Sequence, residues 1–284
     1  MDKEAFDLTL LRQWVGRTET LQDVVNGEKL RALAGTLDRE PPADNALPPL
    51  WHWTHFWPIV AASQTGEDGH PRRGGFLPPV PLPRRMWAGG RLQFSAPLPV
   101  GTSITRTSRI LDVNAKSGST GQLAFVTVRH EISANGSVAV SEEHDIVYRD
   151  LPPPGVAPVP GKPAPEGEAW SRLITPDPVL LFRYSALTFN GHRIHYDRSY
   201  VTEVEGYPGL IVHGPLIATL LVDLLHRNLP QAQLSAFSFR GVGPLFDIEP
   251  FTVCGQPQAD GKTVKLWAKN MRGELAMQAD AVIA

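Results

Sequence analysis

A proline- and glycine-rich segment divides this chain into two halves. Residues 151–167 carry Pro152-Pro153-Pro154-Gly155 near one end and Pro163-Ala164-Pro165 near the other. Proline has no backbone N–H to donate to a neighbouring strand, so such a segment does not continue inside a sheet. We therefore predict a semi-rigid linker at 151–167, between an N-terminal domain, residues 1–150, and a C-terminal domain, residues 168–284.

Both halves show the same order of patterns, helical spacing first and strand-like alternation afterwards. Helix is predicted over residues 4–38, with a break at residues 16–20, and again over residues 214–228. Asn135-Gly136 is typical of a type I′ hairpin turn. Strands are predicted at residues 91–94, 103–113, 123–132, 139–148, 233–239, 251–256, 263–269 and 274–283. The repetition predicts a duplicated α+β unit, in which each half packs an antiparallel sheet around one helix and the two sheets can join edge to edge.

Composition argues against several classes of partner. A hydrophobic fraction of 42% and a charged fraction of 20% are normal for a globular protein with a core. The net charge of −2 gives no basic surface for nucleic acid. Cys254 is the single cysteine, which excludes an internal disulfide and a Cys-based zinc site. Without a secretory signal or an apolar run of the ~20 residues that span a bilayer, we expect a soluble, cytoplasmic protein with no membrane partner.

Two stretches of the N-terminal half combine aromatic residues with polar side chains. Residues 50–60 hold three tryptophans, for which we predict a packing role, together with His52 and His55, whose roles are left open. Arg84 and Arg85 precede Trp87. A paired arginine beside an indole can clamp a phosphate-bearing ligand, or it can be a solvated basic loop beside a buried tryptophan.

The densest group of reactive side chains lies at residues 183–197 of the C-terminal half. His192 and His195 offer imidazoles close together, but a zinc-protease glutamate pattern is missing and ligands from this turn alone are cramped, so we predict no metal. The chain also lacks the Gly-x-Ser-x-Gly elbow of serine hydrolases. Gly214 stands just before an apolar helix, where a free backbone N–H stabilises negative charge on a carbonyl oxygen. An imidazole near such a donor is suited to adding or removing water beside a carbonyl.

Residues 185–197, followed by Gly209-Leu210-Ile211-Val212-His213-Gly214, resemble the MaoC-like hydratase/dehydratase group of hot dog proteins. The resemblance is greatest to the double-hot-dog branch, which includes itaconyl-CoA and mesaconyl-C4-CoA hydratases and FAS1-type dehydratases. Residues 83–92 also resemble that branch, so the likeness spans nearly the whole chain. It implies a double hot dog, two antiparallel sheets each wrapped around a central helix. It further implies reversible hydration of a 2-enoyl-CoA in the C-terminal half, with a non-catalytic N-terminal half that helps to form the acyl-CoA site.

The resemblance also implies roles for single residues. His195 matches the histidine that activates water, and Gly214 matches the backbone donor to the thioester oxygen. Asn190 stands where the common motif has aspartate, and an amide cannot exchange a proton as a carboxyl group does. We therefore predict that Asn190 positions the water while His195 moves the proton alone; assistance from His192, Tyr184 or Asp197 is left open.

The substrate is predicted to be a dicarboxylic monothioester such as itaconyl-CoA or mesaconyl-C4-CoA, on the strength of the family branch. No metal or organic cofactor is expected, and coenzyme A enters only as part of the substrate. Two alternative functions are left open, a hot dog thioesterase and a non-catalytic acyl-CoA-binding module. A homodimer of double-hot-dog subunits is also left open. Arg240, between Phe239 and Gly241, is the arginine we expect least to be idle. The candidate substrate-binding residues are Arg84, Arg85, Arg183, Arg193, Arg240, Tyr184, His192 and His213.

Overall fold

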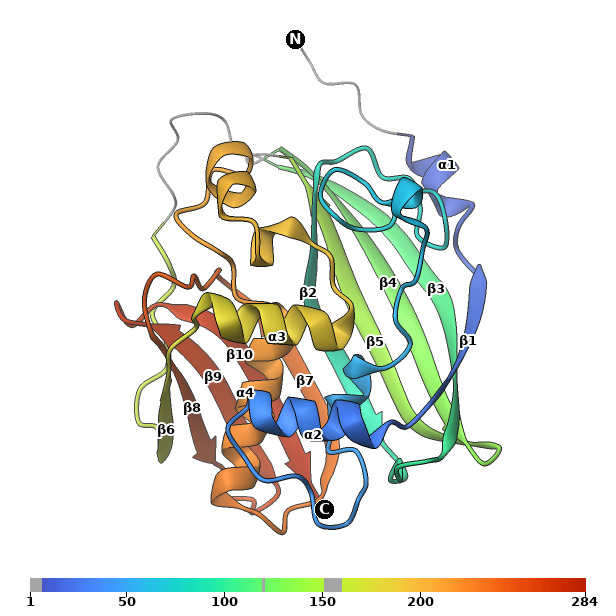
Figure 1. Ribbon diagram of the computed structural model, residues 1–284. Helices are drawn as coiled ribbons and strands as arrows, with labels where there is room; N and C mark the ends of the chain where they lie inside the picture. Colours follow the sequence, from blue (N-terminus) through green and yellow to red (C-terminus); the bar gives the residue numbers. More distant parts are fainter. Residues whose placement is uncertain (1–6, 119–120, 151–159) are drawn as a thin grey trace.

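Strand β2, Arg84–Phe94, and strand β7, Leu234–Gly241, pair antiparallel and join the two halves into one sheet (Figure 1). The computed structural model describes residues 7–118, 121–150 and 160–284. At the junction, Gly90 lies opposite Phe239, and a Cβ on this glycine would come within 2.9 Å of the phenyl ring. Glycine therefore lets the two strands pair beside a buried aromatic side chain.

The sheet has ten strands in the order β1-β3-β4-β5-β2-β7-β10-β9-β8-β6, and each neighbouring pair is antiparallel. Five strands come from each half. The alternating burial along β4 is that expected for a strand with one covered and one solvated face. The other strands are β1 Thr18–Val24, β3 Ser103–Gly118, β4 Gly121–Ala134, β5 Ser137–Arg149, β6 Trp170–Ile174, β8 Phe251–Pro257, β9 Thr263–Asn270 and β10 Leu275–Ile283.

Helix α4, Gly214–Asn228, is the centre of the C-terminal half. Each of its residues from Leu216 to Leu225 is buried, and the helix packs against β6, β8, β9 and β10. Burial of a leucine, isoleucine or valine side chain contributes about 1.5–3 kcal/mol, so this apolar run is a main source of stability for the half. Helices α2, Gly27–Thr36, and α3, Pro178–Thr188, contact each other, and both contribute to the same core (Figure 1).

The inner face of the N-terminal strands is covered differently. Side chains of β3, β4 and β5 pack against Val80 and Leu82 of a loop and against Leu11 of the short helix α1, Leu8–Arg12. Phe56, from another irregular segment, covers the opposite end of these strands. The two predicted sheets do join edge to edge, through β2 and β7, into one continuous sheet. Helix α4 packs against the C-terminal strands, whereas loops and α1 cover the inner face of β3, β4 and β5.

A buried carboxylate ties the C-terminal end of α4 to its surroundings. Asp223 has a fully buried side chain and pairs with Arg227 at 2.7 Å, Arg172 of β6 at 2.8 Å and Arg39 at 3.0 Å. Three cations around one buried carboxylate satisfy its oxygens, which a buried charge requires. The network connects α4 with β6 and with the segment that follows α2.

Several sequence predictions are corrected by the structure. The predicted helix over residues 4–38 is wrong in its middle, because Thr18–Val24 pairs with β3 as strand β1. Its residues alternate between exposed and half-buried, a period of two. Helix α3 and strand β6 were not predicted. Most of the predicted linker, residues 151–159, lies outside the described residues; beyond it Pro163 bridges to Glu274.

Other predictions are confirmed. Helix 214–228 and all eight predicted strands are present, although β2 begins earlier than predicted, at Arg84. Asn135 and Gly136 have φ of 50° and 80°, the left-handed values of a type I′ turn. Among the described helices, none has the length and apolar composition to span a membrane.

Candidate active site

His195 lies in a 3₁₀ turn, Arg193–His195, that follows α3, and its side chain is buried. Its Nδ1 is 2.7 Å from the backbone oxygen of Ile211, and a carbonyl only accepts, so Nδ1 carries the hydrogen. Burial lowers the pKa of His195 to about 4, against an opposing effect of the Ile211 bond. The ring is therefore neutral near pH 7, and its Nε2 is a proton acceptor.

The N-terminus of α4 lies beside this imidazole. The ring of His195 stacks on that of His213 at 3.7 Å and 18°, and His213 immediately precedes Gly214, the first residue of the helix. Among the described residues the N–H of Gly214 has no side-chain or turn acceptor, and Pro215 has no N–H. The start of the helix thus offers a backbone donor close to His195, the arrangement that stabilises an oxyanion.

His213 and Tyr184 form a buried support behind His195. His213 Nε2 is 2.8 Å from Ser185 Oγ, and burial lowers the pKa of His213 well below its usual value. The Tyr184 ring lies 5.1 Å from the His213 ring, and burial raises the pKa of its hydroxyl, which interacts with Thr219 of α4. These predicted site residues are therefore brought to His195, packed against it from the protein side.

Asn190 is placed by the end of α3. Phe189 adopts the left-handed conformation that ends the helix, with φ of 51°, and Asn190 N–H donates to Ser185 at 2.8 Å. The side-chain oxygen of Asn190 accepts from His192 N–H at 3.0 Å. Because that oxygen holds the loop, the amide nitrogen is the part of Asn190 that remains able to bind another group.

Two of the predicted arginines are committed to ion pairs within the protein. Arg84 is buried, pairs with Glu205 at 2.8 Å and stacks over Tyr207. Arg193 pairs with Asp197 at 2.7 Å and lies over Tyr200. Both guanidinium groups stabilise the segment that follows His195, so their role is structural.

Two more arginines lie away from the histidines. Arg240 is exposed, whereas its neighbour Phe239 is buried in the core, and successive strand residues point to opposite faces. The structure therefore places Arg240 on the solvated face of the sheet, contrary to our expectation for it. Arg183 is exposed on α3, beside a surface groove of about 420 Å³ between α2 and α3.

Arg85 is the predicted arginine that faces the site. It pairs across the sheet with Tyr148, whose side chain is fully buried on the inner face. Burial raises the pKa of the Tyr148 hydroxyl, and the positive charge of Arg85 opposes that shift. Burial lowers the pKa values of His70 and His192, and the positive charge of Arg85 adds to both shifts. A half-buried cation of the N-terminal half thus lies near enough for its charge to act on both histidines.

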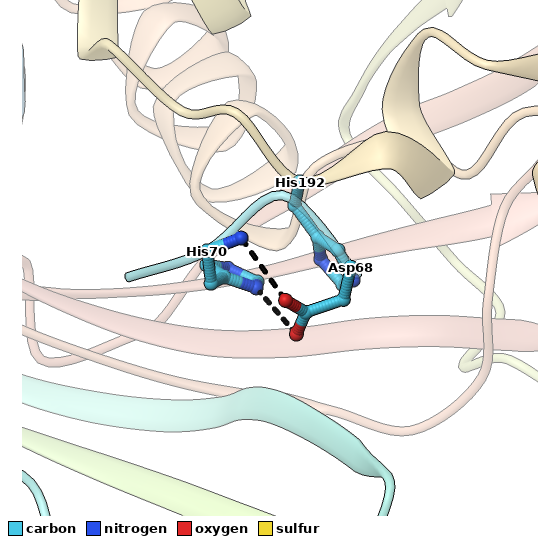
Figure 2. A group of neighbouring side chains, drawn as sticks. All are labelled: Asp68, His70 and His192. Atoms are coloured by element: carbon cyan, nitrogen blue, oxygen red, sulfur yellow. Dashed lines mark hydrogen bonds and ion pairs between the residues drawn. The ribbon is translucent and has the colours of Figure 1, made fainter. Parts of the chain in front are cut away.

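The N-terminal half also supplies two residues that the sequence interpretation missed. His192 lies against His70, with ring centroids 4.1 Å apart, and His70 pairs with Asp68 (Figure 2). The only local signal was Asp68-Gly69-His70 within a Gly/Pro-rich loop. One possible ligand atom from each of Asp68, His70 and His192 lies within 4.8 Å of the others, a spacing that a metal ion also requires.

His52 and His55, left open above, lie elsewhere in the core. His52 Nε2 is 3.1 Å from Glu142, a buried carboxylate that also accepts from the indole of Trp53. His55 Nε2 accepts from Asn26 N–H at 3.1 Å, and burial lowers the pKa of His55 to about 4. Both histidines therefore have hydrogen-bonding roles inside the N-terminal half.

Comparison with known proteins identifies the family. A model described as hydroxyacyl-thioester dehydratase type 2 matches residues 50–247. The mesaconyl-C(4)-CoA hydratase of Chloroflexus aurantiacus is 47% identical over 269 residues, covering 94% of this chain and 95% of the relative.

Solved structures show the fold. A MaoC-like dehydratase from Phytophthora capsici matches with a TM-score of 0.69 at 14% identity, covering 98% of this chain and 99% of the other. A Mycobacterium tuberculosis protein with a double hot dog fold matches with a TM-score of 0.56 at 13% identity, covering 95% and 96%. The predicted resemblance is confirmed: the chain belongs to the hydroxyacyl-thioester dehydratase type 2 family of MaoC-like hot dog proteins and is an enzyme of the hydratase/dehydratase type.

Proposed function

We propose that this enzyme adds water reversibly to the double bond of a 2-enoyl-CoA whose acyl group carries a second, free carboxylate. Mesaconyl-C4-CoA is the first candidate and itaconyl-CoA the second. The observation that carries the proposal is a neutral His195 with a free Nε2 beside the first N–H of α4. The 47% identical relative, named as a mesaconyl-C(4)-CoA hydratase, supports the choice of substrate.

In the proposed hydration, His195 Nε2 takes one proton from a water molecule as its oxygen bonds to the β-carbon. The electron pair of the double bond moves toward the thioester, and negative charge develops on the thioester oxygen. Gly214 N–H binds that oxygen more strongly as the charge grows, which lowers the barrier more than it tightens substrate binding. The His195 imidazolium then returns the proton to the α-carbon. The amide nitrogen of Asn190 positions the water, and no metal or organic cofactor takes part.

Arg85 is the proposed partner of the free carboxylate. A guanidinium binds a carboxylate through two parallel hydrogen bonds, and Arg85, unlike Arg84 and Arg193, has no carboxylate of its own among the described residues. Its charge acts on His192, so a carboxylate bound there would lie in the neighbourhood of the proposed reacting groups, as the short acyl chain of a C4 or C5 substrate requires. The N-terminal half would in this way help to form the acyl-CoA site.

The test is a panel of enoyl-CoA thioesters, with and without a distal carboxylate, followed by absorbance of the enoyl-thioester conjugation and by release of free thiol. We expect loss of conjugation without free thiol, and a fall in kcat of about 10³-fold for His195→Ala, because the proton acceptor is lost. Free thiol would indicate a thioesterase, and binding without reaction a non-catalytic module.

Substitution of Arg85 tests the substrate assignment. Arg85→Met should raise KM for the dicarboxylic substrate by about 10- to 100-fold, since a charged hydrogen bond contributes about 1.5–3 kcal/mol, and should leave a monocarboxylic enoyl-CoA little changed. Arg240→Met is the comparison, and we expect no effect because Arg240 lies on the other face of the sheet. An effect at Arg240 instead of Arg85 would contradict the assignment.

A further inference from the structure

The loop that carries Asp68 and His70 is docked tightly on the segment between Asn190 and His195. Arg193 N–H donates to the Asp68 backbone oxygen at 2.9 Å, and the Arg193 guanidinium reaches the Glu67 backbone oxygen at 3.1 Å. The backbones of Gly69 and Gly191 touch: a Cβ on Gly191 would lie 2.7 Å from the Gly69 oxygen. The contact leaves no room for a side chain at Gly69 or Gly191. Both glycines are therefore needed for the loop to pack this closely against the segment between Asn190 and His195.

The hydrogen bond between His70 and Asp68 fixes the state of the imidazole. Asp68 accepts from the backbone N–H of His70 at 3.0 Å and from its Nδ1 at 3.1 Å (Figure 2). These bonds and the nearby histidines lower the pKa of Asp68 against the effect of burial, so the group is a carboxylate that only accepts. Nδ1 of His70 therefore carries the hydrogen. Its Nε2 is left as an acceptor, as in His195, where the Ile211 carbonyl takes the same role.

His70 lies close to the proposed reacting groups. Its ring is 4.1 Å from that of His192, which in turn is 5.4 Å from that of His195. Two imidazoles with accepting Nε2 atoms, one from each half of the chain, thus belong to one cluster with His192, and the charge of a protonated His70 lowers the pKa of His195. A water molecule has two O–H bonds. A base removes one proton faster when a second acceptor binds the other O–H and so fixes the orientation of the water.

A metal ion bound by Asp68, His70 and His192 is a less favourable use of these groups. Both Asp68 oxygens already accept hydrogen bonds from His70, one from its backbone N–H and one from its Nδ1. The positive charge of Arg85, which acts on both His70 and His192, also repels a second cation.

We propose that His70, oriented by Asp68, is a second catalytic residue that accepts a hydrogen bond from the water that His195 deprotonates. This inference rests on the proposed hydratase function. In the hydration step one water O–H bond breaks toward His195 Nε2 while the remaining O–H stays bonded to His70 Nε2 and becomes the product hydroxyl. His70 takes no net proton, and the proton on His195 goes to the α-carbon.

The test is a comparison of wild-type enzyme with His70→Asn and Asp68→Asn in the hydration assay. His70→Asn should lower kcat by about 10²-fold with KM changed less than threefold, because orientation of the water is lost and substrate binding is not. Asp68→Asn should lower kcat less, since an amide oxygen still accepts from Nδ1. His226→Gln, at the far end of α4, is the matched control; burial lowers the pKa of this histidine too, and we expect wild-type behaviour.

The acid side of the pH profile supplies a readout that a purely structural role would not change. Burial lowers the pKa values of His70 and His195 to about 4. At His70, Asp68 opposes this shift, and the positive charges of Arg85 and Arg73 add to it. If both imidazoles must be neutral, wild-type kcat/KM at pH 4 should be about a quarter of its plateau, and that of His70→Asn about half. Circular dichroism and unfolding curves at each pH check that all variants remain folded.

The outcomes separate the inference from the function on which it rests. Wild-type enzyme that hydrates no thioester of the panel overturns the proposed function. Active wild-type enzyme with a His70→Asn variant of unchanged kcat and unchanged acid limb overturns the role of His70 alone. Activity that is abolished by EDTA and restored by Zn²⁺ would make Asp68, His70 and His192 a metal site, and would also overturn it.

Discussion

At the scale of single residues, the hydrogen bond at one ring nitrogen decides what a buried histidine can do with the other. His195 and His70 each give their Nδ1 hydrogen to a fixed oxygen and keep a free Nε2. His213 is also buried, but its Nε2 is held by Ser185. All three are equally visible in the sequence, and their different availability comes from contacts made by residues distant in the chain.

Asn190 yields a prediction that separates its two polar atoms. Its oxygen holds His192 N–H, so Asn190→Asp keeps that bond and loses only the amide donor, whereas Asn190→Ala loses both. If the donor positions the water, both variants should lose about 10-fold in kcat, far less than His195→Ala. Steady-state kinetics with mesaconyl-C4-CoA measure this. Recovery of activity in Asn190→Asp would assign Asn190 a loop-holding role, and near-complete loss in Asn190→Ala would indicate a direct part in proton transfer.

At the scale of elements, regular structure was predictable and the loops around the site were not. Eight of the ten strands and α4 follow from local alternation and apolar runs, which each segment carries by itself, whereas α3 and β6 were not predicted. Strand β1 lies within the helix predicted over residues 4–38, and what makes it a strand is its pairing with β3, a contact between segments distant in the sequence. The Asp68–His70 loop is polar and rich in glycine, and nothing within it indicates that it closes against Gly191.

The contact between Gly69 and Gly191 makes the loop testable without changing any polar group. Gly191→Ala would place a methyl group 2.7 Å from the Gly69 backbone oxygen, so the loop must move and carry His70 with it. We expect kcat to fall about as far as in His70→Asn, with little change in KM, measured by the same hydration assay. A crystal structure of the variant should show the loop displaced. Full activity with a displaced loop would mean that His70 does not act in catalysis.

At the scale of the whole molecule, the two halves contribute unequal parts to the proposed site. The C-terminal half provides His195, Asn190 and the start of α4, and the N-terminal half provides Arg85 and the Asp68–His70 pair. The Gly90–Phe239 seam of the continuous sheet holds these parts in register. The duplication predicted from the sequence explains why the two meanders can share a sheet. The domain limits and a homodimer of such subunits stay predictions.

Stability should depend on pH, because the molecule buries several neutral histidines. Burial lowers the pKa values of His55, His70 and His195 to about 4, below the ordinary 6.5. Between these pH values the unfolded chain binds more protons than the folded one. The contribution of these histidines to the free energy of unfolding is therefore largest above about pH 6.5 and falls as the pH drops toward 4. Urea unfolding at pH 7, 6 and 5 measures this. His55→Gln, remote from the proposed chemistry, should flatten the dependence by up to about 1.4 kcal/mol per pH unit. A wild-type stability that does not change from pH 7 to 5 would mean that these histidines are hydrated and protonate freely in the folded state.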